Sequence, residues 1–421
     1  MLADITDRKR QEPRPARAPR HQLVDALRGL CFVLMTADHL PANLLWRFSN
    51  STYGPFGFFT AASGFVFLAG LVAGMVYDRH WQHYGRKAMM RRVWRRICTL
   101  YLTHLALFFT LWLLVVWQVP GSSTWHLTFF RAHPWKAVWL SVLLLHEPGL
   151  LGLLPMYCFF LGCTPLLLGA LRRGHVWWLL GGSGVLWVVA GLVIRLPADP
   201  EGIRFGLFNP LSYQLLFIGG LTFGTGAIPM DGLSPARERV VVVSAVVIAG
   251  CLGLLRWAYA LHPAMAAVVE HYHQWVSVVQ QGPVRLLNFA ACGVVVYWWA
   301  RHRRWGGACA NPLVRGCAFL GEHSLPVCVW SVLTTYLALA VLPEQPTRGV
   351  RALALVLAVA SLLLPACLHA QLRHHRKKRG GVSRERPFGA ARFRRLCTTE
   401  LPGPPGANAG RFTVSRSSSI S

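Results

Sequence analysis

Residues 23–45 of this chain read LVDALRGLCFVLMTADHLPANLL, an apolar stretch interrupted by four ionisable side chains. A helix rises 1.5 Å per residue, so this stretch is long enough to cross a hydrocarbon layer ~30 Å thick. The ionisable residues are Asp25, Arg28, Asp38 and His39. Because such groups are costly inside a bilayer, they mark candidate functional sites. The stretch therefore predicts a membrane-spanning helix that carries part of a site.

Similar apolar stretches recur through most of the chain. Of its 421 residues, 54% are hydrophobic and 14% are charged, whereas soluble domains carry about a quarter charged residues. This composition excludes a soluble enzyme and a disordered protein, and the stretches are too long for the alternating strands of a membrane β-barrel. We predict an all-α polytopic integral membrane helix bundle of about ten transmembrane helices. The spans are expected near residues 23–45, 57–78, 97–119, 150–171, 176–196, 212–228, 239–261, 283–300, 324–342 and 349–371.

Loop charge predicts the orientation of these spans. With the N-terminus inside, the inner segments hold about 33 of the 43 Lys and Arg, and the outer loops hold about six. Residues 137–146 are apolar but too short to span alone. If they crossed, the basic C-terminal tail would lie outside, against the positive-inside rule. We therefore expect ten crossings with both termini cytoplasmic, and a short re-entrant or half-helix segment at 132–155, which is broken at Glu147-Pro148-Gly149.

Three regions follow from this pattern: a basic cytoplasmic tail at 1–22, a membrane domain at 23–371, and a basic tail at 372–421 with the composition of a disordered segment. A net charge of +27 would suggest nucleic acid in a soluble domain. Here the basic residues flank apolar segments, so the lipid bilayer is the expected partner and nucleic acid is not. The 11 Cys lack metal-ligand spacing. We predict no metal site and no permanently bound cofactor.

Arg28 and His39 are eleven residues apart, which returns them to nearly the same helix face, roughly 16 Å apart along the axis. Together they suggest one polar channel, with Arg28 near its cytoplasmic mouth. Asp25 is an i,i+3 partner for Arg28. The alternative for His39 is a core histidine bonded to a backbone carbonyl. Asp38 points away from His39 on an ideal helix, so contact requires a distortion at Pro41 or another partner for the carboxylate.

Four helix-spaced arginines precede the third span and are called the arginine cluster below: Arg91, Arg92, Arg95 and Arg96. Guanidinium groups suit the phosphates of a nucleotide-like cofactor, although topogenic charge is the plainer explanation. Small residues around Ser63, including Gly70 and Gly74, predict a close-packing helix face. Other polar positions give weaker signals: His104, Glu147, Asn209, Gln214 and Glu322-His323-Ser324. The last of these lacks the recognisable order of a catalytic triad, which is defined only by geometry.

Several motifs together resemble the OpgC-type proteins of the transmembrane acyltransferase superfamily. The first is Leu23-Val-Asp-Ala-Leu-Arg-Gly-Leu30 with Asp38-His39-Leu-Pro41, similar to the family's first helix. Four further matches follow in order along residues 22–372: Phe65-Val-Phe-Leu-Ala-Gly70, Leu154-Pro-Met-Tyr157 with Thr164-Pro-Leu-Leu-Leu168, Phe208-Asn-Pro-Leu-Ser-Tyr-Gln-Leu-Leu-Phe217, and Leu320-Gly-Glu-His-Ser-Leu-Pro-Val327.

The resemblance implies a bacterial inner-membrane enzyme that moves an acyl group, succinyl in the type member, from cytosolic acyl-CoA to a periplasmic glucan or other glycan. The superfamily's essential first-helix Arg and His correspond to Arg28 and His39. A histidine suits the role of general base because its pKa lies near neutral pH, with Asp38 as an orienting partner. Arg28 then binds donor phosphate or polarises the thioester carbonyl. One departure is Ser63, where many relatives have Glu.

Two other functions fit parts of the pattern. A transporter would also use a broken segment and intramembrane charges, but no inverted repeat is evident. A non-catalytic glycan export or assembly partner would be favoured if Ser63 marks lost activity. The sequence indicates no oligomeric state.

Overall fold

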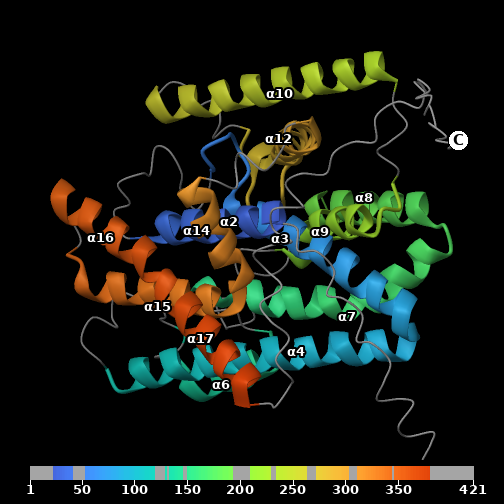
Figure 1. The fold of residues 1–421 in the computed structure, drawn as a ribbon. Helices are drawn as coiled ribbons and strands as arrows, with labels where there is room; N and C mark the ends of the chain where they lie inside the picture. Colours follow the sequence, from blue (N-terminus) through green and yellow to red (C-terminus); the bar gives the residue numbers. More distant parts are fainter. Residues whose placement is uncertain are drawn as a thin grey trace, which may run out of the picture. The chain divides into compact units, whose positions relative to one another are not determined.

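The structure is a computed structural model that describes residues 22–40, 53–118, 129, 132–145, 149–192, 209–228, 234–262, 272–302, 311–343 and 346–379. Within these ranges the regular elements are helices, as predicted, with one isolated β-bridge between Gly54 and Gly57 (Figure 1). The contacts reported below lie within one compact unit, residues 1–373. The predicted tails lie almost entirely outside the described residues, and so does Glu147.

The longer elements, in chain order, are α2 (Gln22–His39), α3 (Ala61–Ala73), the π-helical turn η1 (Gly74–Asp78), α4 (Arg79–Val116), α6 (Pro134–Val142), α7 (Leu153–Arg172), α8 (Val176–Leu192) and α9 (Pro210–Thr225). They continue with α10 (Pro235–Leu261), α12 (Pro283–His302), α14 (Pro312–Glu322), α15 (Ser324–Val341), α16 (Arg348–Ser361) and α17 (Leu363–Arg379). Short 3₁₀ turns lie at Gly149–Leu151 and His273–Val276.

Six helical stretches among the described residues are long and apolar enough to cross a membrane: Ala61–Val116, Leu153–Arg172, Pro235–Leu261, Pro283–His302, Ser324–Val341 and Arg348–His375. The first of these covers most of two predicted spans, 57–78 and 97–119, in one helical run that is kinked at Gly85. Helix α2 carries three full charges in 18 residues. Helices α8 and α9 have 17 and 16 residues, below the ~20 that a crossing needs. The count of ten crossings is therefore not confirmed and stays a prediction.

The segment predicted not to cross forms a short helix. Helix α6 has nine residues and begins at Pro134, where proline's fixed φ suits the first helical turn. It packs on α4, where the Trp112 indole donates to the Pro134 carbonyl at 3.1 Å. The hydroxyl of Tyr101, also on α4, donates to the Val142 carbonyl at 2.9 Å. At nine residues this helix is too short to span a bilayer.

Glycines set the contact between α3 and α9, which lie side by side (Figure 1). A GxxxG pair lies on each side of the contact: Gly70 of α3 with Gly74, the first residue of η1, and Gly220 with Gly224 of α9. A Cβ added at Gly70 would stand 3.0 Å from the Leu221 nitrogen, and one at Gly220 would stand 2.9 Å from the Leu71 nitrogen. Backbone therefore packs directly on backbone, as in membrane helix pairs built on small residues. The close-packing face predicted around Gly70 and Gly74 is confirmed.

A second glycine contact joins α2 to α14. A Cβ at Gly29 would stand 2.9 Å from the Cys317 Cα, and a Cβ at Gly321 would stand 2.7 Å from the Asp25 carbonyl carbon. The two helices can approach this closely only because both positions lack a side chain. This contact brings the late Leu320–Val327 motif against the first helix.

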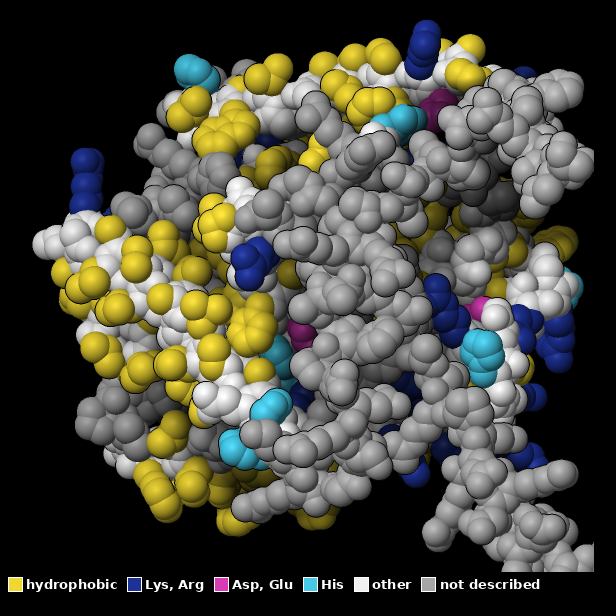
Figure 2. Space-filling model, viewed as in Figure 1, with side chains coloured by type: hydrophobic (Ala, Val, Ile, Leu, Met, Phe, Trp, Pro, Cys, Tyr) yellow, Lys and Arg dark blue, Asp and Glu magenta, His cyan; other side chains and the backbone are white. Residues whose placement is uncertain are grey.

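Apolar side chains cover much of the surface in the view of Figure 2, over the parts where Figure 1 draws α10 and α16. On α10 and α16 many apolar side chains are at least half exposed, among them Val240, Val243, Leu254, Leu353 and Val356. Exposed apolar area on this scale is unusual for a protein in water and expected for helices that face lipid. Lys and Arg gather elsewhere in the same view, near the first half of α4.

Candidate functional site

Arg28 lies in the contact between the first helix and the late motif. Its Nη2 donates to the Ser324 hydroxyl at 2.7 Å, across 296 residues of sequence. Asp25 lies one turn earlier, 3.9 Å from Nη1, and the guanidinium carbon is 5.9 Å from the centre of the Phe65 ring. The buried Nε has no hydrogen-bond partner among the described residues. Arg28 therefore keeps a donor available toward the interior of the bundle.

The arginine cluster divides into two parts. Arg91, Arg92 and Arg95 are exposed, and Arg92 Nη1 lies 3.2 Å from His80 Nδ1. Arg96 is half-buried, and its charge lies within electrostatic range of Arg28. The Tyr157 phenol on α7 also faces Arg28. The cluster thus leads from the surface to the guanidinium of the first helix.

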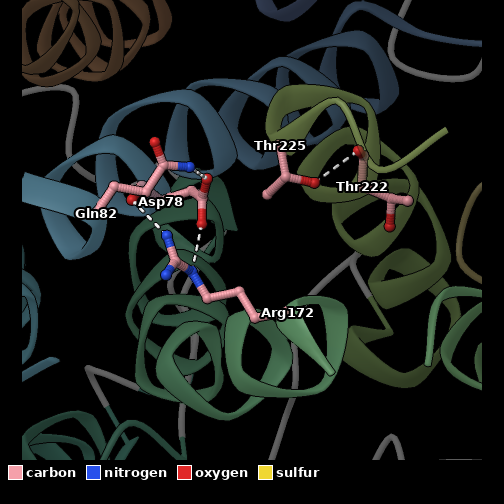
Figure 3. Close-up of polar contacts among 5 residues, drawn as sticks. All are labelled: Asp78, Gln82, Arg172, Thr222 and Thr225. Atoms are coloured by element: carbon pink, nitrogen blue, oxygen red, sulfur yellow. Dashed lines mark hydrogen bonds and ion pairs between the residues drawn. The ribbon is translucent and has the colours of Figure 1, made fainter. Parts of the chain in front are cut away.

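A partly exposed ion pair lies at the start of α4, the helix that carries this cluster (Figure 3). Arg172 Nε, at the end of α7, donates to Asp78 Oδ1 at 2.7 Å. The Gln82 amide donates to Asp78 Oδ2 at 2.6 Å. Asp78 ends the π-helical turn η1, an irregularity often found near functional sites. Gly85 then kinks α4 with φ 77° and ψ 170°, a conformation that favours glycine.

His39 is half-buried at the C-terminal end of α2. Its Nδ1 lies 2.6 Å from the Met35 carbonyl oxygen, one turn earlier. Because a carbonyl only accepts, Nδ1 carries the proton in this contact and Nε2 of a neutral ring keeps its lone pair. Asp38 is buried, and the imidazole bonds to Met35 rather than to this neighbour. Arg28 and His39 lie on one continuous helix, which agrees with their predicted axial separation.

Ser63 lies in a different polar cluster, where α3 meets residues 272–282. Its side chain is fully buried, and its hydroxyl donates to Gln281 Oε1 at 3.1 Å. The Thr60 hydroxyl lies 3.4 Å from it. The Tyr213 hydroxyl, on α9, donates to the Val278 carbonyl at 3.1 Å. Ser63 therefore faces the end of the connection between α10 and α12.

The remaining positions that the sequence singled out hold the fold together. Asn209 caps α9 by accepting from Leu211 N at 3.0 Å. Gln214 exchanges two hydrogen bonds with Ser183 of α8, at 2.7 and 2.8 Å. His104 is fully buried beside the Ser141 backbone. His323 Nδ1 lies 2.9 Å from His369 Nδ1.

Sequence reasoning missed two ionisable residues inside predicted spans. Arg256 on α10 is 1% exposed and Arg285 on α12 is fully buried. The signal was present, since an arginine within a spanning segment suggests a functional site by default. A count of the charges in the loops does not include Arg256 and Arg285, because both lie inside predicted spans. Their surroundings are described below.

These features define a class: a helical membrane protein with a buried polar centre on its first helix and a basic surface leading to it. The chain belongs to the OpgC protein family, whose model matches residues 20–374. Membership of this family indicates a membrane protein with a transferase role of the glucan-modifying acyltransferase type. Comparison with curated proteins and with solved structures finds no significant match. The family match confirms the resemblance inferred from the sequence motifs.

Proposed function

We propose that this protein is a bacterial inner-membrane O-acyltransferase that moves an acyl group from cytosolic acyl-CoA to a hydroxyl of a periplasmic glucan or other glycan. The observation that carries the proposal is the placement of Arg28. It bonds to Ser324 of the late family motif, lies within range of Arg96, and shares its helix with a histidine whose Nε2 can accept a proton. Both termini are taken to be cytoplasmic, as the loop charges predict.

On the donor side, the arginine cluster binds the phosphates of the coenzyme. Acyl-CoA is multiply anionic and soluble, so a basic surface beside the cytosol is the economical place to bind it. Arg96 and Arg28 continue this charge inward and guide the rest of the donor into the bundle.

The helix geometry supports one of the two roles considered for Arg28. A general base acts within ~3 Å of the proton it takes. Arg28 lies roughly 16 Å along the helix from His39, so it is too distant to polarise a carbonyl attacked beside His39. Arg28 therefore binds the donor rather than the reacting carbonyl.

At the reacting centre, His39 Nε2 takes the proton of a sugar hydroxyl as that oxygen attacks the thioester carbonyl. The C–S bond then breaks, and the leaving thiolate takes the proton from the imidazolium. The products are the glycan ester and the free coenzyme thiol, and His39 returns to its neutral form. The Met35 carbonyl fixes the tautomer that this step requires.

The direct test uses the purified full-length protein in liposomes, with succinyl-CoA as donor and a neutral β-glucan as acceptor. The ester on the glucan is measured by mass spectrometry and the released thiol is measured colorimetrically. We expect both products in equal amounts. Donor binding without either product would contradict the proposal and favour transport or an assembly role.

The assembly role has one observation in its favour, the serine at position 63. Ser63→Glu tests it, because a carboxylate restored beside Gln281 should raise transfer if its loss has impaired the enzyme. Unchanged transfer in a wild type that is already active would leave Ser63 as a packing residue.

A further inference from the structure

Two arginines are buried in α10 and α12, far in sequence from the arginine cluster. Arg256 and Arg285 are the largest side chains among those below 2% exposure in the described part of the chain. Helices α10 and α12 contact each other and run antiparallel, since His302 at the end of α12 lies 3.5 Å from Glu238 at the start of α10. The two arginines therefore lie toward the opposite end of this pair, roughly 25 Å along α12 from His302.

Tyr53 links the two guanidinium groups. Its ring packs edge-on against Tyr259 of α10 at 5.2 Å between centroids, three residues after Arg256 on the same helix face. The Arg256 charge faces both Tyr53 and Tyr259. The Arg285 guanidinium carbon is 5.7 Å from the centre of the same Tyr53 ring. The two positive charges thus converge on one phenol.

The guanidinium N–H groups of the two arginines differ in the acceptors that they contact. Arg285 Nε donates to the Val276 carbonyl at 3.0 Å. Arg256 is stacked near Trp257, with 5.1 Å from its guanidinium carbon to the ring centre. Its buried Nε and Nη1 have no acceptor in the part of the chain that the structure describes, and no carboxylate there lies within ion-pair distance of it. Arg256 therefore presents two donors that a ligand can satisfy.

An arginine in this position is expensive without an anion. A buried charge is strongly unfavourable unless it is paired and hydrogen-bonded. Topogenic charge does not account for these residues, because basic residues that set topology lie in cytoplasmic loops. Here the arginines lie at the helix ends joined by residues 262–282, which the loop charges place outside. If these two positions had only a packing role, an uncharged side chain would fill the space without the cost of burying a charge.

The surroundings of the two arginines extend to Ser63 on α3. The Arg285 charge faces Tyr213, whose hydroxyl bonds to Val278. Ser63 reaches the same segment through Gln281. The arginines therefore border the polar cluster on α3 rather than an isolated patch of lipid-facing helix.

We propose that Arg256 and Arg285, with Tyr53, bind an oxyanion of a substrate, a carboxylate or a phosphate. This rests on the proposed acyl transfer. One source of the oxyanion is the distal carboxylate of a dicarboxylic acyl group. The other is an anionic substituent on the glycan acceptor. In both cases guanidinium groups supply charge-assisted hydrogen bonds that a neutral analogue cannot match.

Binding is tested first, without any transfer. The thermal stability of the detergent-purified full-length protein is measured with succinate, inorganic phosphate and the neutral analogue succinamide. We expect stabilisation by at least one anion and none by succinamide. The variants Arg256→Gln and Arg285→Gln should lose it. Arg237→Gln and Arg239→Gln, exposed positions on α10, are the matched controls and should keep it.

Acyl-transfer assays then identify which substrate supplies the oxyanion. Succinyl-CoA and butyryl-CoA are each tested with a neutral glucan and with a phosphate-bearing glucan. If the acyl group supplies the oxyanion, the variants should lower the succinyl to butyryl ratio roughly 30-fold or more with either acceptor. If the acceptor supplies it, they should lower the preference for the anionic glucan by a similar factor with either donor.

Three outcomes would overturn the inference. One is a wild type that no tested anion stabilises. Another is a set of folded variants that keep both the stabilisation and the substrate ratios. If the glutamine variants fail to fold, Arg256→Lys replaces them, and anion response equal to wild type would refute bidentate guanidinium binding. If the wild type binds an anion but transfers no acyl group, the proposed function fails while the anion site stands.

Discussion

Replacing Gly321 by alanine should separate the first helix from the late motif. The new Cβ would stand 2.7 Å from the Asp25 carbonyl carbon and 3.0 Å from the Gly29 nitrogen. Carbon atoms in contact prefer ~3.5–4.0 Å. Helices α2 and α14 must therefore move apart by about 1 Å, because the obstructing atoms belong to backbone.

That displacement has two consequences. Overpacking of this kind costs about 1–3 kcal/mol of folding free energy. A shift of about 1 Å in the donor–acceptor direction would lengthen the 2.7 Å bond from Arg28 to Ser324 beyond hydrogen-bond range. We expect Gly321→Ala to lower both the melting temperature and the affinity for acyl-CoA.

The control lies on the same helix. A Cβ at Gly316 would meet nothing within 4 Å. Gly316→Ala should therefore be neutral or stabilise by up to ~1 kcal/mol, since alanine favours helix over glycine. Tryptophan fluorescence on heating in detergent, with donor titrations below the transition, compares the two variants. Equal melting temperatures and equal donor affinities would refute the glycine contact as the cause of this alignment.

Three further predictions concern the site and the topology. His39→Gln should reduce transfer about 10²–10⁴-fold and leave donor binding intact, and wild-type transfer should rise with pH as the imidazole loses its proton; full activity of the folded variant would make His39 a core residue. Neutralising the arginine cluster in pairs should weaken acyl-CoA binding, more at low salt than at high salt; unchanged affinity in every pair would reduce the cluster to topogenic charge. Reporter fusions after Arg173, Gly282 and Arg379 should give cytoplasmic, external and cytoplasmic signals; any reversal defeats the ten-crossing topology.

The sequence predicted the helical class, because it depends on local patterns, and the same patterns single out the candidate site residues. Apolar length identifies helices, and charge inside an apolar stretch marks Arg28 and His39. The close-packing face at Gly70 and Gly74 was also visible. Its partners, Gly220 and Gly224, could not be assigned, because a small residue does not specify which helix approaches it.

Long-range contacts were beyond the sequence for the same reason. Nothing local in the Glu322-His323-Ser324 run shows that Ser324 bonds to Arg28. The number of membrane crossings is harder still to predict from the sequence. Apolar length alone does not separate a helix of 16 or 17 residues that spans from one that is buried in the bundle.

The bond between Arg28 and Ser324 also has a consequence for biogenesis. Its two partners are 296 residues apart. At ~5–20 residues per second, the ribosome releases Ser324 about 15–60 s after Arg28. The first helix is therefore complete long before the hydroxyl and the glycine-lined surface of α14 that contact it have been made. During that interval Asp25 is the partner that Arg28 has within its own helix, so the contact that positions α2 against α14 can form only after the last third of the chain has been made.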